Sequence, residues 1–426
     1  MGRQRVPGGP HGPRQGAGGG RPVPGAHAGV HPVADVVVVG AGIVGVSTGF
    51  NLARLGAGKI VVLEREGVAA QASRLSAGLV RTHYSNAPEA RLALAGLKWF
   101  ENWAELVGGE VPFWRTGLLN PVAREDHDKL RRNVAMLQAV GVETELIGPE
   151  EMVELEPAIH AKEDDLAAYE PRSGYADPGA TTHAVAGAAR RLGVEIAEGV
   201  EVTRILVEGD RVTGVETPAR RVAAPAVVLA NGAWSVPLAR AVGVEIPIES
   251  VGVRLAFVRR PPDLRPGWGG HAVVLDRAHG AYTRPEGADH SLLGLSGARV
   301  PLTAPDRYDS EARPDAEFEQ LARSQLALRF PSFAEAPVVA HRSGPIDITP
   351  DLCAIIDRVQ PEGLYLAVGM SGSGFKKGPA IGQCVAEMVL HGESRTVPIP
   401  EFRLSRFAEN DLIRGDVYSG PFNLVH

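Results

Sequence analysis

The chain has 426 residues, which is enough for two domains that each enclose a hydrophobic core. Its formal net charge of -6 argues against a nucleic-acid partner or an anionic membrane surface, because both call for a basic face. The only cysteines, Cys353 and Cys384, form neither a C-x-x-C motif nor a metal-ligand spacing. We therefore expect no metal site and a reducing, cytoplasmic compartment. No apolar run is long enough to predict a transmembrane segment.

Residues 1–33 differ in kind from the rest of the chain. They are dominated by Gly, Pro and Arg, contain no Asp or Glu, and show no hydrophobic periodicity. Such a composition cannot bury enough apolar surface to fold, so it predicts a disordered tail. The apolar centre of a secretory signal is also missing. Our hypothesis is that the tail is dispensable, as an overextended reading frame would be.

A glycine-rich turn follows the first strong strand signal. Val36–Val39 is a β-branched run of the kind buried on both faces of a parallel sheet. It leads into Gly40, Gly42 and Gly45, which fit the G-x-G-x-x-G pattern and precede a predicted helix at Ile43–Leu55. The glycines permit a tight turn, a close approach to a pyrophosphate, and close packing of helix on strand. The phosphates would lie at the helix N-terminus.

A second strand, Ile60–Leu63, ends in Glu64, where a carboxylate can accept hydrogen bonds from ribose hydroxyls. The order of strand, glycines, helix, strand and acid favours dinucleotide binding over a turn needed only for packing. The motif alone does not separate NAD from FAD.

The remaining periodicities alternate between helices and short strands. We predict helices near residues 89–107, 125–140, 178–192, 315–328 and 379–390. We predict strands near 113–122, 195–206, 211–216, 226–230, 252–258, 272–275, 280–283, 291–294 and 364–368, with a loop at 169–178. The strands between 251 and 295 indicate an antiparallel sheet.

Three further segments are candidates for contact with a cofactor. Residues 69–86 are rich in small and hydroxylated side chains that could hold phosphate or pass under a ring, although an ordinary polar loop has the same composition. Ala230 ends a strand that runs into the small turn 231–234. The glycine-rich turn 369–376 joins a strand to a helix, where backbone N–H groups could stabilise negative charge on a ring carbonyl.

These landmarks together resemble the flavoprotein family of D-amino-acid oxidases, glycine oxidases and sarcosine oxidases or dehydrogenases. The resemblance rests on VVVVGAGIVG with Glu64, VVLANGAWS at 227–235, SGPIDITPD at 343–351 and GMSGSGFKKGPAIG at 369–382. It covers residues 34 to about 393 and implies FAD as the cofactor. The implied fold is α/β, a Rossmann-like FAD-binding domain with an interleaved α+β substrate domain built on an antiparallel sheet.

The implied FAD domain is discontinuous and comprises residues 34–112, 172–245 and 335–400. The substrate domain comprises 113–171 and 246–334, and residues 401–426 form a C-terminal extension. The resemblance places the cofactor on Gly40, Gly42, Ile43, Val44, Gly45, Glu64, Arg65, Ser73, Arg74, Ser76, Ala77, Gly78, Leu79, Val202, Ala230, Gly232, Trp234, Gly344, Gly369, Ser371, Gly372, Gly374, Phe375 and Lys376.

Two cations match positions that bind a substrate carboxylate in sarcosine-oxidase-like members. They are Arg81 and Lys376, a guanidinium that can grip a carboxylate bidentately and an ammonium that adds a point charge. Either could instead be a solvated surface charge. Further candidates for the substrate pocket are Tyr84 and Tyr282, with His83 and Arg284.

Two departures from the family pattern matter. Gly344 stands where monomeric sarcosine oxidases have a cysteine bonded to the flavin, so we expect noncovalent FAD. Residues 291–295 offer only Ser, Leu and Gly where the same enzymes have an oxygen-activating lysine. A dehydrogenase that passes electrons to another acceptor therefore stays open beside an oxidase.

The implied activity is oxidation of the C–N bond of a small amine or amino acid to an imine by hydride transfer to flavin. One alternative is the flavin subunit of a multi-subunit amine dehydrogenase complex with an electron-acceptor partner protein. Another is an NAD-binding dehydrogenase or a noncatalytic nucleotide-binding module.

Overall fold

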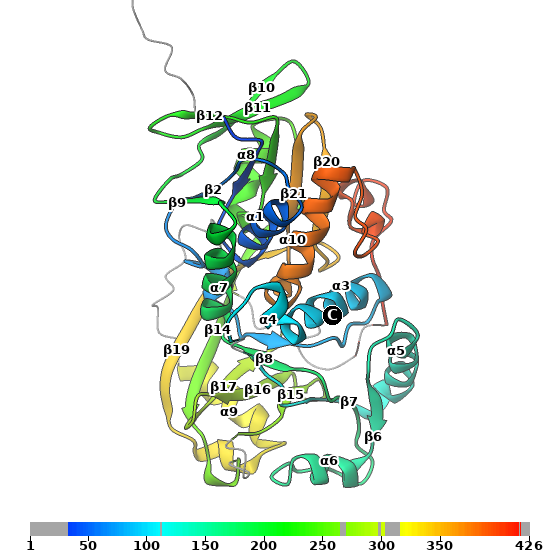
Figure 1. The fold of residues 1–426 in the computed structure, drawn as a ribbon. Coiled ribbons are helices and arrows are strands. Elements are labelled where there is room, and N and C mark those ends of the chain that lie inside the picture. Colours follow the sequence, from blue (N-terminus) through cyan, green and yellow to red (C-terminus); the bar gives the residue numbers. More distant parts are fainter. Residues whose placement is uncertain are drawn as a thin grey trace, which may run out of the picture. The chain divides into compact units, whose positions relative to one another are not determined.

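A six-stranded sheet carries the first glycine-rich turn (Figure 1). The computed structural model describes residues 33–110, 113–264, 270–296, 300–302, 316–416 and 418. The strand order is β20 (Ile355–Val359), β21 (Leu364–Val368), β13 (Ala226–Leu229), β1 (Val36–Val39), β2 (Ile60–Glu64) and β9 (Glu195–Glu198). The strands pair in parallel except β20, which is antiparallel to β21 at one edge.

Strand β1, in the middle of this sheet, is buried on both faces, as predicted. Val36 and Val38 belong to one core cluster and Val37 and Val39 to another. Helices that contribute to the first cluster include α1 (Ile43–Arg54), α3 (Ala87–Glu101), α7 (Pro178–Arg191) and α10 (Gly374–His391). The second is shared with strands β10 (Arg204–Glu208), β11 (Arg211–Glu216) and β12 (Arg221–Ala223) and with helix α8 (Ser235–Arg240).

A larger, nearly antiparallel sheet forms the second layer, in the lower half of Figure 1. Its nine strands are β18 (Val300–Pro301), β14 (Glu249–Arg259), β17 (His290–Leu295), β16 (Ala281–Glu286), β15 (Val273–Asp276), β5 (Leu118–Val122), β7 (Leu166–Glu170), β6 (Glu145–Ile147) and β19 (Val338–Ile348), which pairs with β14. Only β15 and β5 pair in parallel. Helix α9 (Ala316–Ala327) packs on this sheet through a third core cluster. The fold is therefore the expected α/β combination.

Two expectations about strands were wrong. The segment 169–178 contains the end of β7 and strand β8 (Gly174–Ala176), which pairs with β3 (Leu79–Val80) and β4 (Phe113–Trp114). The stretch 195–206 forms β9 and the start of β10 rather than one strand. Strands this short depend on their partners, and a period-2 pattern cannot reveal them.

The last long helix also begins earlier than predicted. Helix α10 starts at Gly374, so Phe375 and Lys376 lie in its first turn and Pro379 lies inside it. The start was expected at about residue 379, but the helix begins five residues earlier and continues through Pro379. This shift attaches Lys376 to a rigid element.

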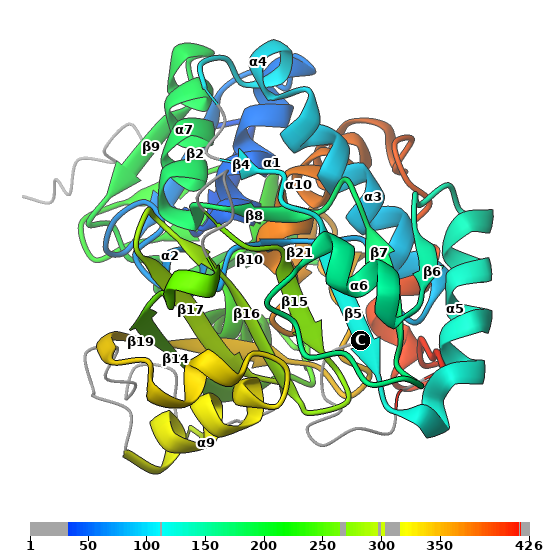
Figure 2. The same ribbon diagram turned by 90° about the horizontal axis from the view of Figure 1, so that it is seen from below.

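The remaining helices lie around these sheets. They are α2 (Ala72–Leu75), α4 (Trp103–Leu106), α5 (His127–Ala139) and α6 (Pro149–Leu155), with short 3-10 turns at Pro400–Phe402 and Leu404–Arg406. Figure 2 shows α5 beside the last part of the chain, drawn in red. The domain boundaries given above stay a prediction.

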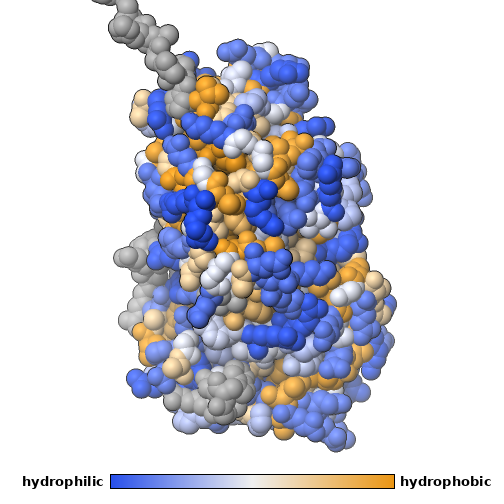
Figure 3. Space-filling view, in the orientation of Figure 1, coloured by the Kyte–Doolittle hydropathy of each residue, from blue (hydrophilic) through white to orange (hydrophobic). Residues whose placement is uncertain are grey.

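The chain ends and the surface add three observations. The predicted tail lies outside the described residues except for Val33, which makes a bridge to Ala223. Figure 3 shows a mostly hydrophilic face, with hydrophobic residues surfacing chiefly in its upper middle part. Among the described residues, we find no helix with the length and hydropathy needed to span a bilayer.

Candidate functional site

A cavity of about 550 Å³ lies where the carboxyl ends of the parallel strands meet the larger sheet. Its wall includes Val39, Glu64 and Ala230, at the ends of β1, β2 and β13, and residues of strands β14 to β17. Ligands of open α/β sheets bind outside the carboxyl ends of the strands. The volume falls within the range of small-molecule sites, roughly 300–1,000 Å³.

The first glycine-rich turn forms one side of this cavity. Gly40 has a φ of +101°, and a Cβ on Gly45 would lie 1.9 Å from the Gly40 carbonyl oxygen. Any side chain at Gly45 would therefore push α1 away from the turn. The amide N–H groups at the α1 N-terminus consequently lie close to the cavity, where they can meet an anion.

Two side chains are held against this turn by hydrogen bonds. The Glu64 carboxylate accepts the N–H of Ala41 at 2.8 Å and that of Glu66 at 2.9 Å. The Ser73 hydroxyl accepts the N–H of Ile43 at 2.9 Å. An acid and a hydroxyl beside a helix N-terminus are suited to ribose and phosphate recognition.

Arg65 and Trp234 stack on one another at the same end of the cavity. The guanidinium carbon of Arg65 lies 4.5 Å from the centre of the Trp234 ring, and both residues line the wall. Val202 lines it beside them. The turn after β13 thus contributes the Trp234 ring to the cavity wall, in addition to backbone atoms.

The second glycine-rich turn, between β21 and α10, is held by Asp347. Its Oδ2 accepts the N–H of Gly369 at 2.6 Å and that of Met370 at 3.2 Å. Burial raises the pKa of Asp347 to about 6 in spite of these bonds. Ser371 adopts a φ of +49°, an uncommon conformation for a residue other than glycine. The turn is therefore fixed in a demanding shape beside the cavity.

Two buried cations, Arg81 and Lys376, line the same cavity. Arg81 donates a hydrogen bond to the His83 carbonyl, and its guanidinium lies 4.3 Å from the centre of the Tyr84 ring. Lys376 has no hydrogen-bond or ion-pair partner among the residues that the structure describes. Burial, with the charges of Arg81 and Lys377, holds the pKa of Lys376 well below its ordinary value. A carboxylate in the cavity would restore the charged form.

The larger sheet contributes an apolar roof to the cavity. Tyr282 faces Gly294 across β16 and β17, and a Cβ on Gly294 would lie 2.2 Å from the Tyr282 ring. Burial raises the pKa of Tyr282 to about 12, so its hydroxyl stays protonated. The other roof residues are Val253, Leu255, Leu275, Leu295 and Ser296. This roof contains no cation among the residues described.

Most of the predicted site residues meet in this one cavity. Those that line it are Gly40, Gly42, Ile43, Val44, Glu64, Arg65, Ser73, Ser76, Ala77, Leu79, Arg81, Val202, Ala230, Gly232, Trp234, Tyr282, Gly344, Ser371, Gly372, Gly374, Phe375 and Lys376. Their cofactor and substrate roles stay predictions, which we take up below.

Seven other candidates do not line the cavity, and one of them, Arg74, is exposed to solvent. They are Gly45, Arg74, Gly78, His83, Tyr84, Arg284 and Gly369. The glycines are packing positions: a Cβ would lie 2.3 Å from the Ala176 carbonyl oxygen at Gly78 and 2.5 Å from Thr349 at Gly369. Tyr84 supports Arg81, and Arg284 donates to the Ala77 carbonyl oxygen at 2.5 Å.

Sequence reasoning missed several wall residues, of which Asp347, Asn231 and Met370 lie closest to the recognised motifs. All three stand inside stretches that were quoted for the resemblance. An acid two residues before a Thr-Pro-Asp segment was the available signal for Asp347. The roof residues carried no signal, because apolar strand residues of this kind most often belong to a core.

Neither cysteine of the chain lines the cavity, so its wall offers no thiol for covalent attachment of a ligand. Gly344 lines the cavity, and a Cβ there would lie 2.7 Å from the Leu75 side chain. Cys353 and Cys384 are both buried, unpaired and absent from the wall. Within the described ranges, no cluster of His, Cys, Asp or Glu side chains could hold a metal ion.

Comparison with known proteins places this site in a family. Residues 35–388 match the family DAO, described as FAD dependent oxidoreductase. The chain belongs to the DAO family of FAD-dependent oxidoreductases. It is 29% identical to sarcosine oxidase subunit beta of Arthrobacter sp over 388 residues, which covers 89% of this chain and 92% of that protein.

Two solved structures of the DAO type extend the likeness. L-proline dehydrogenase from P. horikoshii has a TM-score of 0.82 at 26% identity, covering 90% of this chain and 100% of that chain. Glycine oxidase from Geobacillus kaustophilus has a TM-score of 0.77 at 26% identity, covering 88% and 99%. FAD is therefore the cofactor, and the NAD alternative left open by the first motif is wrong.

The residues of the cavity fit this cofactor. The glycine turn leaves no room for side chains, the α1 N-terminus offers N–H groups to phosphates, and Glu64 and Ser73 provide polar atoms beside them. The second glycine-rich turn leads into the N-terminus of another long helix, α10. Two helix N-termini in one wall suit a ligand with a pyrophosphate and an electron-accepting ring.

Proposed function

We propose that this DAO-family protein oxidises the C–N bond of a small amine that carries a carboxylate, giving an imine. The observation that carries the proposal is the placement of Arg81 and Lys376, two buried cations, in the wall of the cofactor cavity. Lys376 is buried without a hydrogen-bond or ion-pair partner among the described residues, so a carboxylate in the cavity would favour its charged form. Sarcosine oxidase and glycine oxidase, by their names, act on molecules of this class.

Each wall element has a role in this proposal. Arg81 and Lys376 bind the substrate carboxylate, and Tyr282 limits the space above it. The apolar roof excludes water and favours the neutral amine over the ammonium form, which leaves the nitrogen lone pair available. When bound, FAD supplies the acceptor for the hydride that leaves carbon. The residues predicted above to bind FAD, with Gly40, Glu64 and Ser73 foremost, orient it by backbone and polar contacts.

The electron acceptor is the second part of the proposal. The roof offers no cation among its described residues, so we propose slow reaction with oxygen and transfer of electrons to another acceptor. One relative is named as a subunit, sarcosine oxidase subunit beta, which supports the alternative of a flavin subunit in a larger complex. The two buried, unpaired cysteines support a reducing, cytoplasmic compartment.

The first experiment is an absorption spectrum of the purified protein, followed by anaerobic titration with sarcosine, glycine, proline and D-amino acids. We expect yellow protein that one carboxylate-bearing amine bleaches, and slow recolouring in air. Bleaching by an amine without a carboxylate at equal efficiency would contradict the role of the two cations. Rapid recolouring would contradict the proposed acceptor.

Lys376→Met tests the substrate site separately from the cofactor site. Methionine keeps most of the side-chain volume but removes the charge. We expect normal FAD content and a loss of substrate affinity of about tenfold or more, the size of a lost charged hydrogen bond. Lys98→Met, on an exposed position of α3, is the matched control.

A further inference from the structure

The last described part of the chain, residues 401–416 and 418, reaches residues 83–85, close in sequence to Arg81. We call it the C-terminal segment. It follows α10 and passes beside α5, where Figure 2 shows it in red. Neither the sequence motifs nor the proposed function gives this segment a role.

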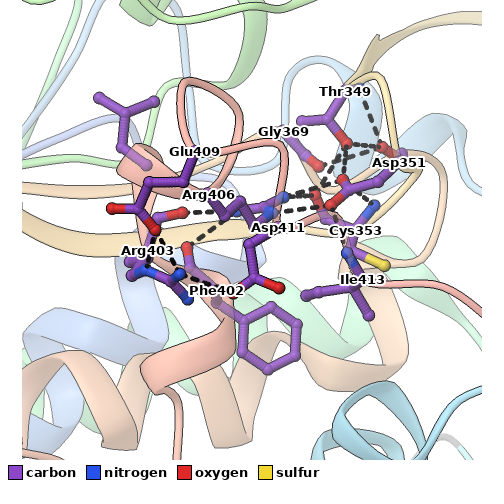
Figure 4. A network of polar contacts seen from close by, with 12 residues as sticks. Thr349, Asp351, Cys353, Gly369, Phe402, Arg403, Arg406, Glu409, Asp411 and Ile413 are labelled. Atoms are coloured by element: carbon purple, nitrogen blue, oxygen red, sulfur yellow. Dashed lines mark hydrogen bonds and ion pairs between the residues drawn. The ribbon is translucent and has the colours of Figure 1, made fainter.

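Arg406 fixes the C-terminal segment in place through all five N–H groups of its guanidinium. Its guanidinium is fully buried and forms a two-pronged contact with Asp351, with Nε to Oδ2 at 2.7 Å and Nη2 to Oδ1 at 2.9 Å. The carbonyl oxygens of Cys353, Phe402 and Arg403 accept the other three N–H groups. Figure 4 shows this network. An arginine with five satisfied donors fixes the backbone around it firmly.

The anchor lies directly behind the second glycine-rich turn. Asp351 Oδ1 accepts a bond from the Thr349 hydroxyl at 3.3 Å, and the Thr349 N–H donates to the Ser371 hydroxyl at 3.2 Å. Burial raises the pKa of Asp351, but the Arg406 hydrogen bonds and charge lower it overall, so the carboxylate is ionised. The C-terminal segment is therefore fixed at Arg406, behind the second glycine-rich turn.

Beyond Arg406, the C-terminal segment crosses the stretch of backbone that follows Arg81. A Cβ on Gly415 would lie 2.0 Å from the Ser85 carbonyl oxygen, so the two backbones touch there. Three residues later Tyr418 is buried, with only 3% of its surface exposed. Its hydroxyl lies 2.9 Å from His83 Nε2 and accepts a bond from Asn133 Nδ2 at 2.8 Å.

The direction of the Tyr418 hydrogen bond follows from its neighbours. Asn133 Nδ2 also lies 3.0 Å from His83 Nε2, and an amide nitrogen can only donate. His83 Nε2 is therefore an acceptor, and the Tyr418 hydroxyl donates to it. Burial, with the charges of Arg277 and Arg81, holds the pKa of His83 well below its ordinary value, which keeps the ring neutral.

His83 in turn fixes the position of Arg81. Its carbonyl oxygen accepts a hydrogen bond from Arg81 Nη1, and the next residue, Tyr84, supports the guanidinium by its ring. Thr82, between them, donates its N–H to the buried Glu170 carboxylate at 3.0 Å. A ring held by Tyr418 and Asn133 therefore sets the backbone from which Arg81 reaches the cavity.

We propose that Tyr418 of the C-terminal segment is a positioning residue that holds Arg81, through His83, in the geometry that binds a substrate carboxylate. The proposal rests on the proposed function for the role of Arg81. It links a segment more than three hundred residues away in sequence to the substrate site.

Tyr418→Phe tests the link, because it removes one hydroxyl and keeps the ring. The probe is propionate, a carboxylate without an amine, and its binding is followed by the change in flavin absorption. We expect propionate to bind about threefold to tenfold more weakly, the range for one lost buried hydrogen bond. FAD content, thermal stability and affinity for the neutral probe propionamide are expected to stay close to those of the parent protein. Equal weakening for propionamide would overturn the proposal.

Two further variants separate this proposal from the proposed function. Arg81→Gln is expected to remove propionate binding, and adding Tyr418→Phe to it is expected to have no further effect, as required if Tyr418 acts through Arg81. A loss in Arg81→Gln with unchanged binding in Tyr418→Phe would overturn the positioning role and leave the carboxylate site intact. Unchanged binding in Arg81→Gln would overturn both.

The matched control is Tyr365→Phe. Tyr365 is a buried tyrosine on β21 that does not line the cavity. This variant is expected to bind propionate as the parent does. A loss equal to that of Tyr418→Phe would show that removing a tyrosine hydroxyl outside this network has the same effect, and would overturn the proposal.

Discussion

Lys377 and Glu89 form an ion pair in which both side chains are almost completely buried. The pair joins the first turn of α10 to the first turn of α3, and the Lys377 ammonium also lies 4.9 Å from the centre of the Tyr84 ring. The adjacent Lys376 lines the cavity instead. Lys377 thus contributes to the stability of the fold, whereas we propose that its neighbour Lys376 contributes to binding.

Lys377→Met should therefore destabilise the protein much more than Lys376→Met. The first variant leaves the Glu89 carboxylate buried without its partner, which costs about 3–5 kcal/mol of the free energy of unfolding. The second removes a cation that the fold does not compensate, so it should not lower stability. Chemical denaturation of the two variants measures the difference. Lys377→Met combined with Glu89→Leu should recover most of the loss.

Carboxylate affinity should fall with rising pH. The ligand binds the ammonium form of Lys376, whose pKa is lowered by burial and by Arg81 and Lys377. As pH rises through this lowered pKa the cation is lost, so propionate binding should weaken below the usual range of lysine titration, about pH 10.4. Titrations from about pH 6 to about pH 10 measure the effect. In Lys376→Met the profile should be flat over this interval, and a wild-type profile equally flat would contradict the role of Lys376.

Gly294→Ala should damage the substrate site while FAD is retained. The added methyl group would lie 2.2 Å from the Tyr282 ring, which must then swing into the cavity. We expect substrate affinity to fall at least tenfold with normal flavin content, since the added methyl group meets Tyr282 and not the glycine-rich turns. Flavin absorbance and anaerobic reduction measure the two quantities. Gly187→Ala in α7, whose new methyl group meets only ordinary contacts, should leave both unchanged.

Glu156 should make the protein less stable as pH rises. The side chain is buried, Oε2 accepts the Ala272 N–H at 2.9 Å and Oε1 has no partner. Burial raises the pKa of Glu156 from 4.5 to about 7. Its folded pKa exceeds its unfolded value, so its stabilising contribution is complete below pH 4.5 and is lost as pH rises through about 7.

Glu156→Gln removes this pH dependence. At about 1.4 kcal/mol for each pKa unit, the variant should gain on the order of 3 kcal/mol over the parent by about pH 8. Thermal denaturation at several pH values measures the gain. Glu154→Gln, on the exposed side of α6, is the control and should follow the parent curve. If the stability of Glu156→Gln changed with pH in the same way as that of the parent, the raised pKa of Glu156 would be contradicted.

Local sequence was sufficient for the cofactor half of the site. A buried β-branched strand and a turn that requires Gly40 at φ +101° have a physical cause within a few residues, so both could be predicted. The second glycine-rich turn was recognised for the same reason. The start of α10 was not, because the helix begins within the glycines and takes in Pro379.

Tertiary structure decided the substrate half. Arg81 and Lys376 carry no local sign that both reach one cavity, because their meeting depends on how α10 packs against α3 and on the strand pairing of the roof. The role of Asp347 was invisible for the same reason, since its partners Gly369 and Met370 are 22 and 23 residues away.

The sequence by itself determined the family, the two glycine-rich turns that we propose bind FAD, and the presence of two candidate carboxylate-binding cations. Those features depend on backbone conformation and residue chemistry, which act over short distances along the chain. Only the tertiary structure decided that Tyr418 meets His83 and that Tyr282 lies over Gly294. Such contacts join segments that are far apart in the sequence. The positions of these segments depend on burial of the whole core, and the hydrophobic effect, which is non-directional, does not specify which distant residues meet.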